Sequence, residues 1–422
     1  MKKILLTLII IILYVIIFKE FNIKIYNKLP IQVKTIVLSL LSNDKTSKKI
    51  TNDLKTKFLP ETQLIDLNYK KIKLSGIDLE EFEVAHGMYA KTYKSFFLEN
   101  FSEQIFLMSK SGLLFYFEEK NLLNDDLQFN TIKTNIIKKR DTILNFHISG
   151  ENVYISIAKL VNDNCEKLQL KKGKLNLQEI TFSSVINFDE CLLPGQVGGG
   201  AIASFKKSGE EKILLSVSDY NVLNKNYNFS VTRAQNEKSI FGKILLIDPL
   251  KKTYENFSMG HRVALGLYSD LNGDIMLSVE NGPKGGDEIN KLVYKNNYGW
   301  NIASYGEEYG VKKQRQPSLF KSHSERNFTE PLFSYTPSIA PSSIIKLDNN
   351  FSPFWRDNFL MGTLIYGHLV RLKFDKNFDK LILNEPIYIG ERIRDLIYIK
   401  KSKIILLALE STGSIGLLSL KN

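Results

Sequence analysis

A pattern of one turn followed by one short strand, repeated along most of the chain, most constrains how this sequence can fold. Each copy begins with Gly, Ser, Asn, Asp or Lys residues and continues as a run of aliphatic, β-branched or aromatic residues. The copies are residues 111–117, 149–157, 208–217, 272–279, 348–361 and 401–409. Runs of this composition between turn residues are typical of strands joined as hairpins. Asn272-Gly273 is the best match to a two-residue type I′ turn.

The spacing of these copies favours a closed ring of sheets. Six units over about 360 residues leave roughly 60 residues each, enough for four strands and their loops. Amphipathic helical periodicity is scarce, so we expect an all-β fold, a six-bladed β-propeller, whose last strand (residues 413–420) closes the ring against early sequence. Two β-sandwiches in tandem are the alternative, although no linker-like composition interrupts residues 60–420.

The N-terminus carries a predicted membrane anchor. Lys2 and Lys3 precede an apolar run of 15 residues, 4–18, with no small-residue cleavage site after it. This predicts an uncleaved anchor helix over residues 1–26, although cleavage stays open. Residues 27–58 form a predicted juxtamembrane linker, and residues 59–422 the propeller. Lysines after the run would keep the C-terminal side in the cytoplasm by the positive-inside rule, so the orientation needs other evidence.

The net charge of +12 is concentrated near the N-terminus. Residues 1–58 contain 11 lysines and three carboxylates, so the other 364 residues carry only +4. These residues show no arginine-rich stripe and no basic motif interleaved with aromatics. The charge therefore argues against nucleic-acid binding and belongs to the membrane-proximal segment.

The chain has two cysteines, Cys165 and Cys191. In an oxidising compartment they could form a disulfide that closes a loop of about 27 residues. Two buried thiols are the alternative. The polar flanks of both cysteines resemble loops near strand ends rather than core, which leaves both alternatives open and modestly supports an outward-facing body.

Residues 280–290 and 297–300 form the strongest candidate for a functional loop. They combine four glycines, a proline and three carboxylates between strand-forming flanks. Glycine lets the backbone approach a ligand closely, and carbonyl and carboxylate oxygens are the ligands that Ca²⁺ prefers. The composition predicts a metal or cofactor loop outside the core, with an ordinary glycine-rich turn as the alternative.

Several motifs in this order resemble the glucose/sorbosone dehydrogenase family, the soluble PQQ-dependent aldose sugar dehydrogenases. They are Gly260-His-Arg262, residues 280–290, residues 297–300 and Gly390-Glu-Arg-Ile-Arg-Asp395, with residues 242–248 and 337–342 in addition. The similarity covers roughly residues 100–415 and is strongest over 240–310. The resemblance implies a six-bladed propeller exported from the bacterial cytoplasm, which places the body outside.

The resemblance also implies roles for individual residues. Carbonyls of Gly282 and Pro283 would bind a Ca²⁺ that also binds PQQ, and Glu288 with the Tyr298 carbonyl would bind a second, structural calcium. Arg262, Arg392 and Arg394 would bind the anionic quinone and neutralise charge on its oxygens, where planar guanidinium donors suit carboxylates. Ser338 would supply a hydroxyl that a family threonine provides. Salt bridges between blades, to Asp395 or Asp287, are the alternative for the arginines, and a turn-capping carboxylate is the alternative for Glu288.

Other positions depart from the family. Gln196 stands where the family has the catalytic histidine that removes the sugar hydroxyl proton, and glutamine cannot accept that proton. Val263 replaces an asparagine that bonds the cofactor, and Ile365 falls near the position of a cofactor lysine. Asn281 stands where many members have histidine, which is a mild change.

The five histidines offer few substitutes for the missing base. We expect His147 to be a hydrogen-bonded strand histidine and His261 to orient the Arg262 loop. His86, His323 and His368 lack partner spacing for a metal or a catalytic triad. Of these, His368 is the best candidate base, because it follows the stretch expected to reach the cofactor.

Three functions follow from these observations. The first is a PQQ- and Ca²⁺-dependent dehydrogenase that takes hydride from a sugar or alcohol. The second is a propeller without oxidation chemistry that binds carbohydrate or a protein partner at the membrane surface. A propeller hydrolase of the lactonase kind would need polar metal ligands from several blades, which the sequence does not show. The predicted location is the bacterial inner membrane, with the propeller in the periplasm. The sequence predicts no oligomeric state.

Overall fold

The computed structural model describes residues 67–421, apart from 75–76, 78, 87–88, 125–126, 138–139, 220–232, 308–318 and 321. For the strands within 82–91 only the backbone is described. The predicted anchor (1–26), linker (27–58) and start of the propeller at 59 lie outside these residues and stay predictions. In the described part of the chain, no helix has the length and apolar character needed to cross a membrane.

The strands form six sheets of four or five strands each. The first sheet contains β4 (Phe96–Phe101), β5 (Gln104–Ser109), β6 (Leu114–Glu118), β7 (Asn130–Thr134) and β11 (Glu179–Ile180). The second contains β8 (Asp141–Ser149), β9 (Asn152–Asn162), β10 (Cys165–Lys174) and β12 (Ser183–Leu192). The third contains β13 (Gly199–Lys207), β14 (Glu210–Val217), β15 (Lys243–Asp248) and β16 (Thr253–Met259).

The remaining three sheets follow the same order. The fourth contains β17 (Ala264–Ser269), β18 (Met276–Glu280), β19 (Asp287–Lys291) and β20 (Phe333–Tyr335). The fifth contains β21 (Pro341–Lys346), β22 (Phe359–Thr363), β23 (His368–Phe374) and β24 (Leu381–Tyr388). The sixth contains β25 (Ile393–Ile399), β26 (Ile404–Leu409), β27 (Ser414–Leu420) and β1 (Leu67–Lys73).

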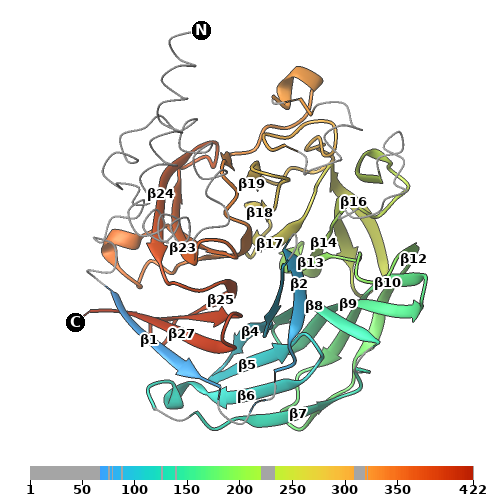
Figure 1. The fold of residues 1–422 in the computed structure, drawn as a ribbon. Coiled ribbons are helices and arrows are strands. Elements are labelled where there is room, and N and C mark those ends of the chain that lie inside the picture. Colours follow the sequence, from blue (N-terminus) through green and yellow to red (C-terminus); the bar gives the residue numbers. More distant parts are fainter. Residues whose placement is uncertain are drawn as a thin grey trace, which may run out of the picture. The chain divides into compact units, whose positions relative to one another are not determined.

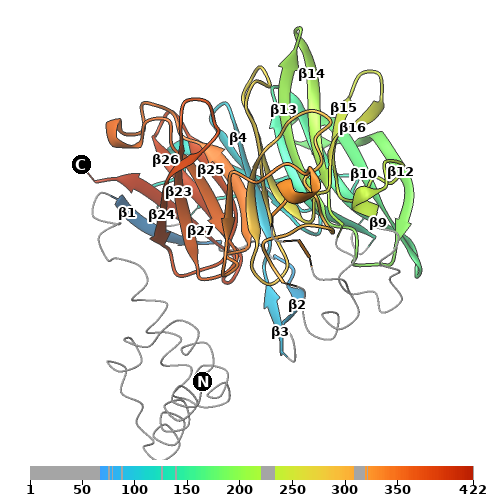
Figure 2. The same ribbon diagram turned by 90° about the horizontal axis from the view of Figure 1, so that it is seen from above.

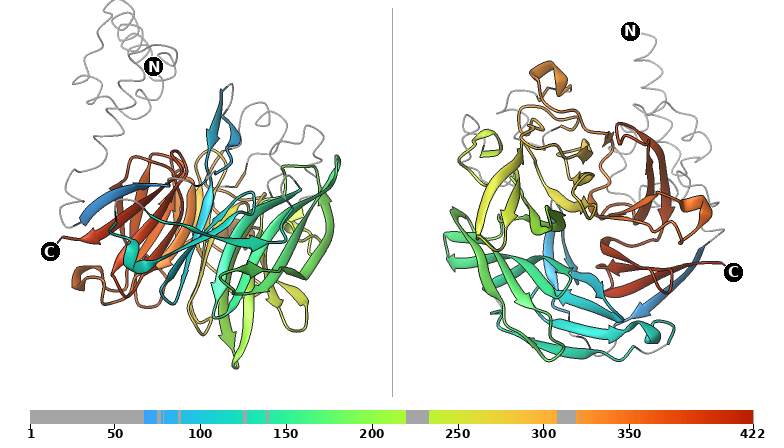
Figure 3. Two further views of the ribbon diagram at one scale, coloured as in Figure 1. Left: turned by 90° about the horizontal axis from the view of Figure 1, so that it is seen from below. Right: turned by 180° about the vertical axis from the view of Figure 1, so that it is seen from behind.

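These sheets are the blades of a ring, which Figure 1 shows along its axis and Figure 3 also shows from behind. The first strand of each blade contacts the first strands of both neighbouring blades, so β4, β8, β13, β17, β21 and β25 surround the axis. The predicted all-β, six-bladed β-propeller is confirmed, and tandem β-sandwiches are excluded.

The last blade is built from both ends of the propeller. Strand β27 pairs antiparallel with β1, from Leu420 opposite Leu67 to Ser414 opposite Lys73. The predicted closure of the ring by the C-terminal strand is therefore confirmed. Closure leaves no open sheet between the first and last blades.

In the part of the chain that the structure describes, a hairpin and four short helices lie outside the blades. Figure 2 shows the hairpin of β2 (Phe82–His86) and β3 (Tyr89–Tyr93) projecting from one face of the ring, ahead of β4. The 3₁₀-helices are η2 (Glu119–Asn121), η4 (Arg233–Gln235), η6 (Ser324–Arg326) and η7 (Pro353–Trp355).

All six predicted turns are turns in the structure, but they are not equivalent. Five join the first and second strands of blades two to six, whereas the turn at Ser111-Gly112 joins β5 to β6, the second and third strands of the first blade. The two-residue turn predicted at Asn272-Gly273 is wrong. Residues 270–275 all lie between β17 and β18, because Asp270 and Ile275 are hydrogen-bonded across a longer loop.

The core consists of six apolar clusters, one between each pair of neighbouring blades. Middle strands pack on both faces, which explains their continuous apolar runs; all six residues of β26 are buried. Buried serines add hydrogen bonds to the next blade: Ser156 Oγ donates to Gly200 O at 2.6 Å, Ser216 Oγ to Ala264 O at 2.8 Å, and Ser342 Oγ to Ile393 O at 2.6 Å.

Cys165 and Cys191 form a disulfide, with Cα atoms 5.2 Å apart. The bond joins the neighbouring strands β10 and β12 of the second blade. The disulfide, one of the two alternatives that the sequence left open, is present, and the alternative of two buried thiols is wrong.

Candidate functional site

Two kinds of loop open onto one face of the ring, which we call the site face. They are the loops between blades and the loops between the second and third strands of a blade. Eight of the predicted site residues lie in or beside these loops: Gln196, Arg262, Gly282, Pro283, Glu288, Ser338, Arg392 and Arg394. The ninth, Tyr298, lies in the long loop after β19, and its N–H donates to Met259 O at the end of β16. The topology therefore gathers the predicted residues at one face.

The glycine-rich loop between β18 and β19 is compact and fixed by a buried carboxylate. A Cβ on Gly282 would lie 2.0 Å from Gly286 O, so no other residue fits at Gly282. Asp287, only 1% exposed, accepts hydrogen bonds from the N–H groups of Gly282, Ile339 and Ala340 at 2.6–2.8 Å. Burial raises the pKa of Asp287, and these three bonds oppose the shift. The loop is thereby tied to the segment that enters β21. The prediction that this loop stays outside the core is wrong for its carboxylates.

Arg262 precedes β17 and lies against this loop. Its Nη1 donates to Asn281 O at 2.7 Å and to Gly282 O at 2.6 Å, and its guanidinium stacks on the Trp300 ring at 5.1 Å. Ser338 Oγ accepts from Gly285 N at 2.9 Å and donates to Pro283 O at 3.1 Å. Both predicted calcium-binding carbonyls therefore already accept hydrogen bonds from side chains of this chain.

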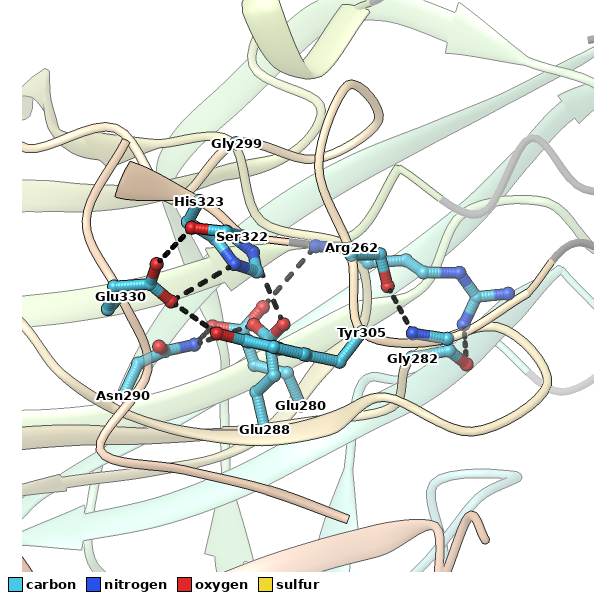
Figure 4. Close-up of polar contacts among 12 residues, drawn as sticks. Arg262, Glu280, Gly282, Glu288, Asn290, Gly299, Tyr305, Ser322, His323 and Glu330 are labelled. Atoms are coloured by element: carbon cyan, nitrogen blue, oxygen red, sulfur yellow. Dashed lines mark hydrogen bonds and ion pairs between the residues drawn. The ribbon is translucent and has the colours of Figure 1, made fainter. Parts of the chain in front are cut away.

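A buried polar network contacts the backbone of Arg262, and Figure 4 shows part of this network. His261 is 1% exposed and lies between Ser258 Oγ at 2.8 Å and Glu280 Oε1 at 2.7 Å. Burial would raise the pKa of Glu280, but the neighbouring His261, Ser278 and Asn290 lower it overall. The expectation that His261 orients this loop is confirmed, since Glu280 Oε2 also accepts from Arg262 N at 3.3 Å.

Glu288 extends this network to His323, which the sequence had left without partners. His323 Nε2 lies 3.5 Å from Glu288 Oε1, and its Nδ1 lies 3.5 Å from Glu330 Oε2 (Figure 4). Burial raises the pKa of Glu288 well above its usual value, and the charge of Glu280 adds to the shift. Glu288 also lines a small cavity beside Tyr298 and Trp300. It lies within β19, so it is not a turn-capping residue.

Arg392 and Arg394 share one buried carboxylate. Glu410, 0% exposed, accepts from Arg392 Nε at 2.6 Å, from Arg394 Nε at 2.7 Å and from Ser95 Oγ at 2.7 Å. Arg392 Nη1 donates to Leu364 O at 2.7 Å. Burial would raise the pKa of Glu410, but both arginines lower it to about 2. The predicted alternative of salt bridges to Asp395 or Asp287 is wrong, because the partner is Glu410.

Gln196 lies in a loop that two carboxylates border. Glu166 Oε2 accepts from Gly195 N at 3.0 Å and from Val197 N at 3.3 Å, which fixes the backbone around Gln196. On the other side, Ser218 N donates to Gly198 O at 3.1 Å, and the next residue, Asp219, donates its N–H to Arg262 O at 2.8 Å. Asp219 is 3% exposed, and burial raises its pKa against the charges of Arg233, Lys243 and Arg262. A buried acid thus lies between the Gln196 loop and Arg262.

The remaining substituted positions provide few polar groups. Val263 is buried, and Ile365 is 36% exposed on the loop between β22 and β23. His368, at the start of β23, packs between the rings of Tyr366 and Tyr388. Burial lowers the pKa of His368 to about 4, so it is neutral at pH 7.

A family model described as glucose / sorbosone dehydrogenase matches residues 104–417, which is most of the propeller. The chain belongs to this family.

Proteins of similar sequence or structure agree with this membership. An uncharacterized protein of Synechocystis sp. (PCC 6803) is 31% identical over 182 residues, covering 40% of this chain and 43% of that protein. Aldose sugar dehydrogenase YliI of Escherichia coli K12 is 28% identical over 171 residues, covering 40% and 44%. These matches span less than half the length of either relative. The PQQ-bound aldose sugar dehydrogenase of Streptomyces coelicolor has a TM-score of 0.57 at 16% identity, covering 84% of this chain and 98% of its own, which supports the fold.

Sequence reasoning missed the carboxylates of this family member's site. Glu410, Glu166 and Asp219 stand in ordinary turn or strand-end sequence, distant from the residues that they contact. Glu410 is 16 and 18 residues from its two arginines, and Ser95 is 315 residues away. The only signal was position, because each carboxylate follows an apolar strand or opens a loop on the face where the other motifs meet.

Proposed function

We propose that the chain is a PQQ-dependent sugar dehydrogenase-like oxidoreductase, which takes hydride from a sugar or another alcohol at the site face. The observation that carries this proposal is the arrangement of the three predicted arginines. Glu410 holds Arg392 and Arg394 at the start of β25, and the loop carbonyls hold Arg262 before β17 on the same face. Family membership supports the substrate class.

The residues present fit a quinone that carries carboxylates. Glu410 binds Nε of both Arg392 and Arg394, and no described residue bonds Arg392 Nη2 or Arg394 Nη1. Near Arg262, buried Asn281 Oδ1 and Trp300 Nε1 also lack hydrogen-bond partners among the described residues. Guanidinium donors suit carboxylates, and buried polar atoms without partners suit a polar ligand.

PQQ, when bound, supplies the electrophile that accepts the hydride. The chain's own residues would bind and orient it: Arg392 and Arg394 through their outward amino groups, and Arg262 from the fourth blade. Their fixed positive charges would stabilise negative charge that develops on the bound ligand, without reorganisation at the moment of reaction. Glu410 keeps both guanidinium groups in one orientation for this task.

The substrate hydroxyl proton needs an acceptor other than Gln196. We assign this role to the carboxylate of Asp219, which lies between the Gln196 loop and Arg262. Its burial raises its pKa, which makes the carboxylate a better proton acceptor than an exposed aspartate. Asp219→Asn should then abolish turnover while ligand binding persists. If His368→Gln abolished turnover and Asp219→Asn did not, the neutral imidazole would take the role instead.

Calcium does not fit at Gly282 and Pro283 as these residues are arranged. Arg262 Nη1 lies 2.6 Å from Gly282 O, so a calcium ion on that oxygen would face a guanidinium charge at close range. In the described part of the chain, no group of three His, Cys, Asp or Glu residues is placed to hold a metal. The second calcium, at Glu288 and the Tyr298 carbonyl, stays a prediction; addition of Ca²⁺ to the chelator-treated chain should raise its melting temperature if the site binds.

A second function is favoured by one observation. Gln196, the residue at the position of the family's base, cannot accept a proton at neutral pH. A propeller that binds carbohydrate or a protein partner without oxidising it would keep the arginines and lose the base. The two functions differ in turnover and agree in binding.

The location of the propeller follows from the disulfide and from the predicted anchor. Disulfides persist in oxidising compartments, and Cys165 and Cys191 are paired. We therefore place the propeller on the periplasmic side of a bacterial inner membrane, attached through residues 1–26 or released if that segment is cleaved. Accessibility of the body to protease in spheroplasts tests this placement.

One titration separates the two functions. The full-length chain is purified, PQQ is added with and without Ca²⁺, and the bound-quinone absorbance is followed while aldoses are added. Binding at micromolar concentration with bleaching supports the dehydrogenase. Binding without bleaching supports the second function, and no binding contradicts the dehydrogenase proposal. Arg394→Lys should weaken binding by about tenfold or more, since a bidentate donor is lost.

A further inference from the structure

Three side chains on neighbouring first strands form a hydrogen-bonded chain that the site face does not use. His147, on β8, contacts Glu99 Oε1 of β4 through Nδ1 at 2.7 Å. Its other ring nitrogen, Nε2, contacts Ser204 Oγ of β13 at 2.8 Å. The sequence prediction of a hydrogen-bonded strand histidine is confirmed. The three residues, however, come from three different blades.

The order of the hydrogen-bonding groups along these three side chains matters. The carboxylate lies at Nδ1 and the hydroxyl at Nε2, which is the order in which an imidazole takes a proton from serine while a carboxylate fixes its tautomer. Ser156 and Ser216, which also join blades, donate instead to backbone carbonyls, and Ser95 donates to the Glu410 carboxylate. Ser258, His261 and Glu280 repeat this order of contacts, but all three are buried, so Ser204 and its partners differ from them by their exposure to solvent.

All three side chains are partly exposed to solvent. The side chains of His147 and Glu99 are 21% and 19% exposed, and Ser204 is half-buried. All three stand on the first strands of their blades, which surround the propeller axis (Figure 1). The three hydrogen-bonded residues therefore lie outside the apolar clusters between the blades.

The backbone beside Ser204 offers a donor for a developing oxyanion. Strand β13 pairs on one side only, with β14. The N–H groups of Ile202 and Lys206 bond partners outside this ladder, Asn145 Oδ1 and Leu271 O. Since amide direction alternates along a strand, Ser204 N–H points to the same open edge, where no described residue bonds it. A nucleophile's own amide is one of the donors that acyl-transfer sites use.

The surroundings are acidic. Asp395, on β25, accepts from Leu98 N at 2.9 Å, one residue before Glu99. Burial, with Glu99 adding to it, raises the pKa of Asp395 to about 7. Carboxyl groups at this position disfavour anionic substrates.

We infer that Ser204 is an acyl-transfer nucleophile, with His147 as its general base and Glu99 as the group that orients the imidazole, acting on small uncharged carboxylic esters. Ser204 Oγ bonds to the ester carbonyl carbon while its proton passes to His147 Nε2. The C–O bond to the alcohol breaks, and the alkoxide leaves with that proton. Water, deprotonated by His147, then attacks the carbonyl carbon of acyl-Ser204. The bond from that carbon to Oγ breaks, the proton passes from His147 Nε2 back to Ser204 Oγ, and the carboxylic acid is released. This inference is independent of PQQ.

A covalent probe tests the inference on the full-length chain. The chain is treated with a fluorophosphonate, and the modified peptide is mapped by mass spectrometry, while hydrolysis of p-nitrophenyl acetate is followed in parallel. We expect one adduct, on Ser204, and ester hydrolysis lost in Ser204→Ala. His147→Gln should slow labelling by about a hundredfold or more, and Glu99→Gln by about tenfold or more. The matched control is Ser343→Ala, which changes a serine of β21 that is not one of the three hydrogen-bonded residues.

Each outcome decides the question. No adduct on the wild-type chain, an adduct on another serine, or labelling that is unchanged in His147→Gln overturns the inference and leaves the three residues as ties between blades. If Ser204→Ala does not fold, the mapped wild-type adduct and the His147→Gln rate still decide. A rate that rises with pH as an imidazole loses its proton supports His147 as the base.

Discussion

The site face holds arginines in two different ways. Beside the glycine-rich loop, Arg262 is held mainly by backbone carbonyls and an indole ring, with Asp219 as a nearby charge. Across the face, Arg392 and Arg394 converge on the fully buried carboxylate of Glu410. The first region uses partial charges and a compact loop, and the second uses a direct ion pair.

Because of this difference, the two regions should lose stability through different kinds of substitution. A buried ion pair fails badly when one partner is removed, because the other charge stays desolvated and uncompensated. Hydrogen bonds from a guanidinium to carbonyls lose less, because no full charge is left behind. The Glu410 region should therefore tolerate small geometric changes but not the loss of a charge. The Arg262 region should tolerate the loss of a charge better than a change in geometry.

The largest expected effect is that of Glu410→Gln. Two buried arginines would lose their shared carboxylate, so the free energy of unfolding should fall by about 3–5 kcal/mol in urea. Glu391→Gln is the matched control. Among the described residues, Glu391, near the same strand, bonds only Lys71 and Thr412, so the change should alter stability by less than about 1 kcal/mol. Equal effects of the two changes would refute the contrast.

Acid should reveal the same carboxylate. The pKa of Glu410 is lowered to about 2, from a usual 4.5. A lowered pKa stabilises the fold above the unfolded pKa, and this stability is lost as pH falls toward 2. One pKa unit is worth about 1.4 kcal/mol, so roughly 3 kcal/mol should be lost over this range. Denaturation curves of Glu410→Gln from pH 5 to pH 2 should lack this component; a parallel decline in both chains would contradict the assignment.

A smaller effect is expected for Arg262→Lys. Lysine keeps the charge but cannot reach Asn281 O and Gly282 O with one planar group, so we expect a loss of about 1–3 kcal/mol. Arg326→Lys, at an exposed arginine over the Phe320 ring, is the control and should cost under about 1 kcal/mol. The comparison breaks if Arg262→Lys costs as much as Glu410→Gln.

The smallest effect should come from Ser338→Ala. The hydroxyl joins Gly285 N and Pro283 O, so its loss should cost about 1 kcal/mol and loosen one loop. Hydrogen exchange at Gly285 N–H should accelerate while exchange in β26 stays unchanged. Unchanged exchange at Gly285 would mean that Asp287 alone fixes the loop.

The sequence predicted the fold well because strands and turns are local. Apolar runs such as β26, and glycines such as Gly209, follow from neighbours in sequence. The turn at Ser111-Gly112 was found but its place in the blade was not, since any hairpin has the same composition. The flanks of Cys165 and Cys191 left the disulfide undecided.

The site was predicted less completely because its pairs are distant in sequence. The family resemblance pointed to Arg392 and Arg394, but their partner Glu410 depends on how the ring places β26 beside β25. His323 lacked partners in sequence and gained Glu288 and Glu330 only through the loop after β19. Likewise, His147 was predicted to be hydrogen-bonded, while its partners Glu99 and Ser204 are 48 and 57 residues away.

The pairing of β1 with β27 gives the propeller a different cooperativity from that of an open repeat array. In an open array the terminal repeats have one neighbour and can fray first. Here each of the six apolar clusters has a blade on both sides, and no blade is terminal. Removal of β1 would take away the strand that ties the two ends of the propeller together in one blade, and the first and last blades would then be held together only by contacts such as those of β25 and β26 with β4.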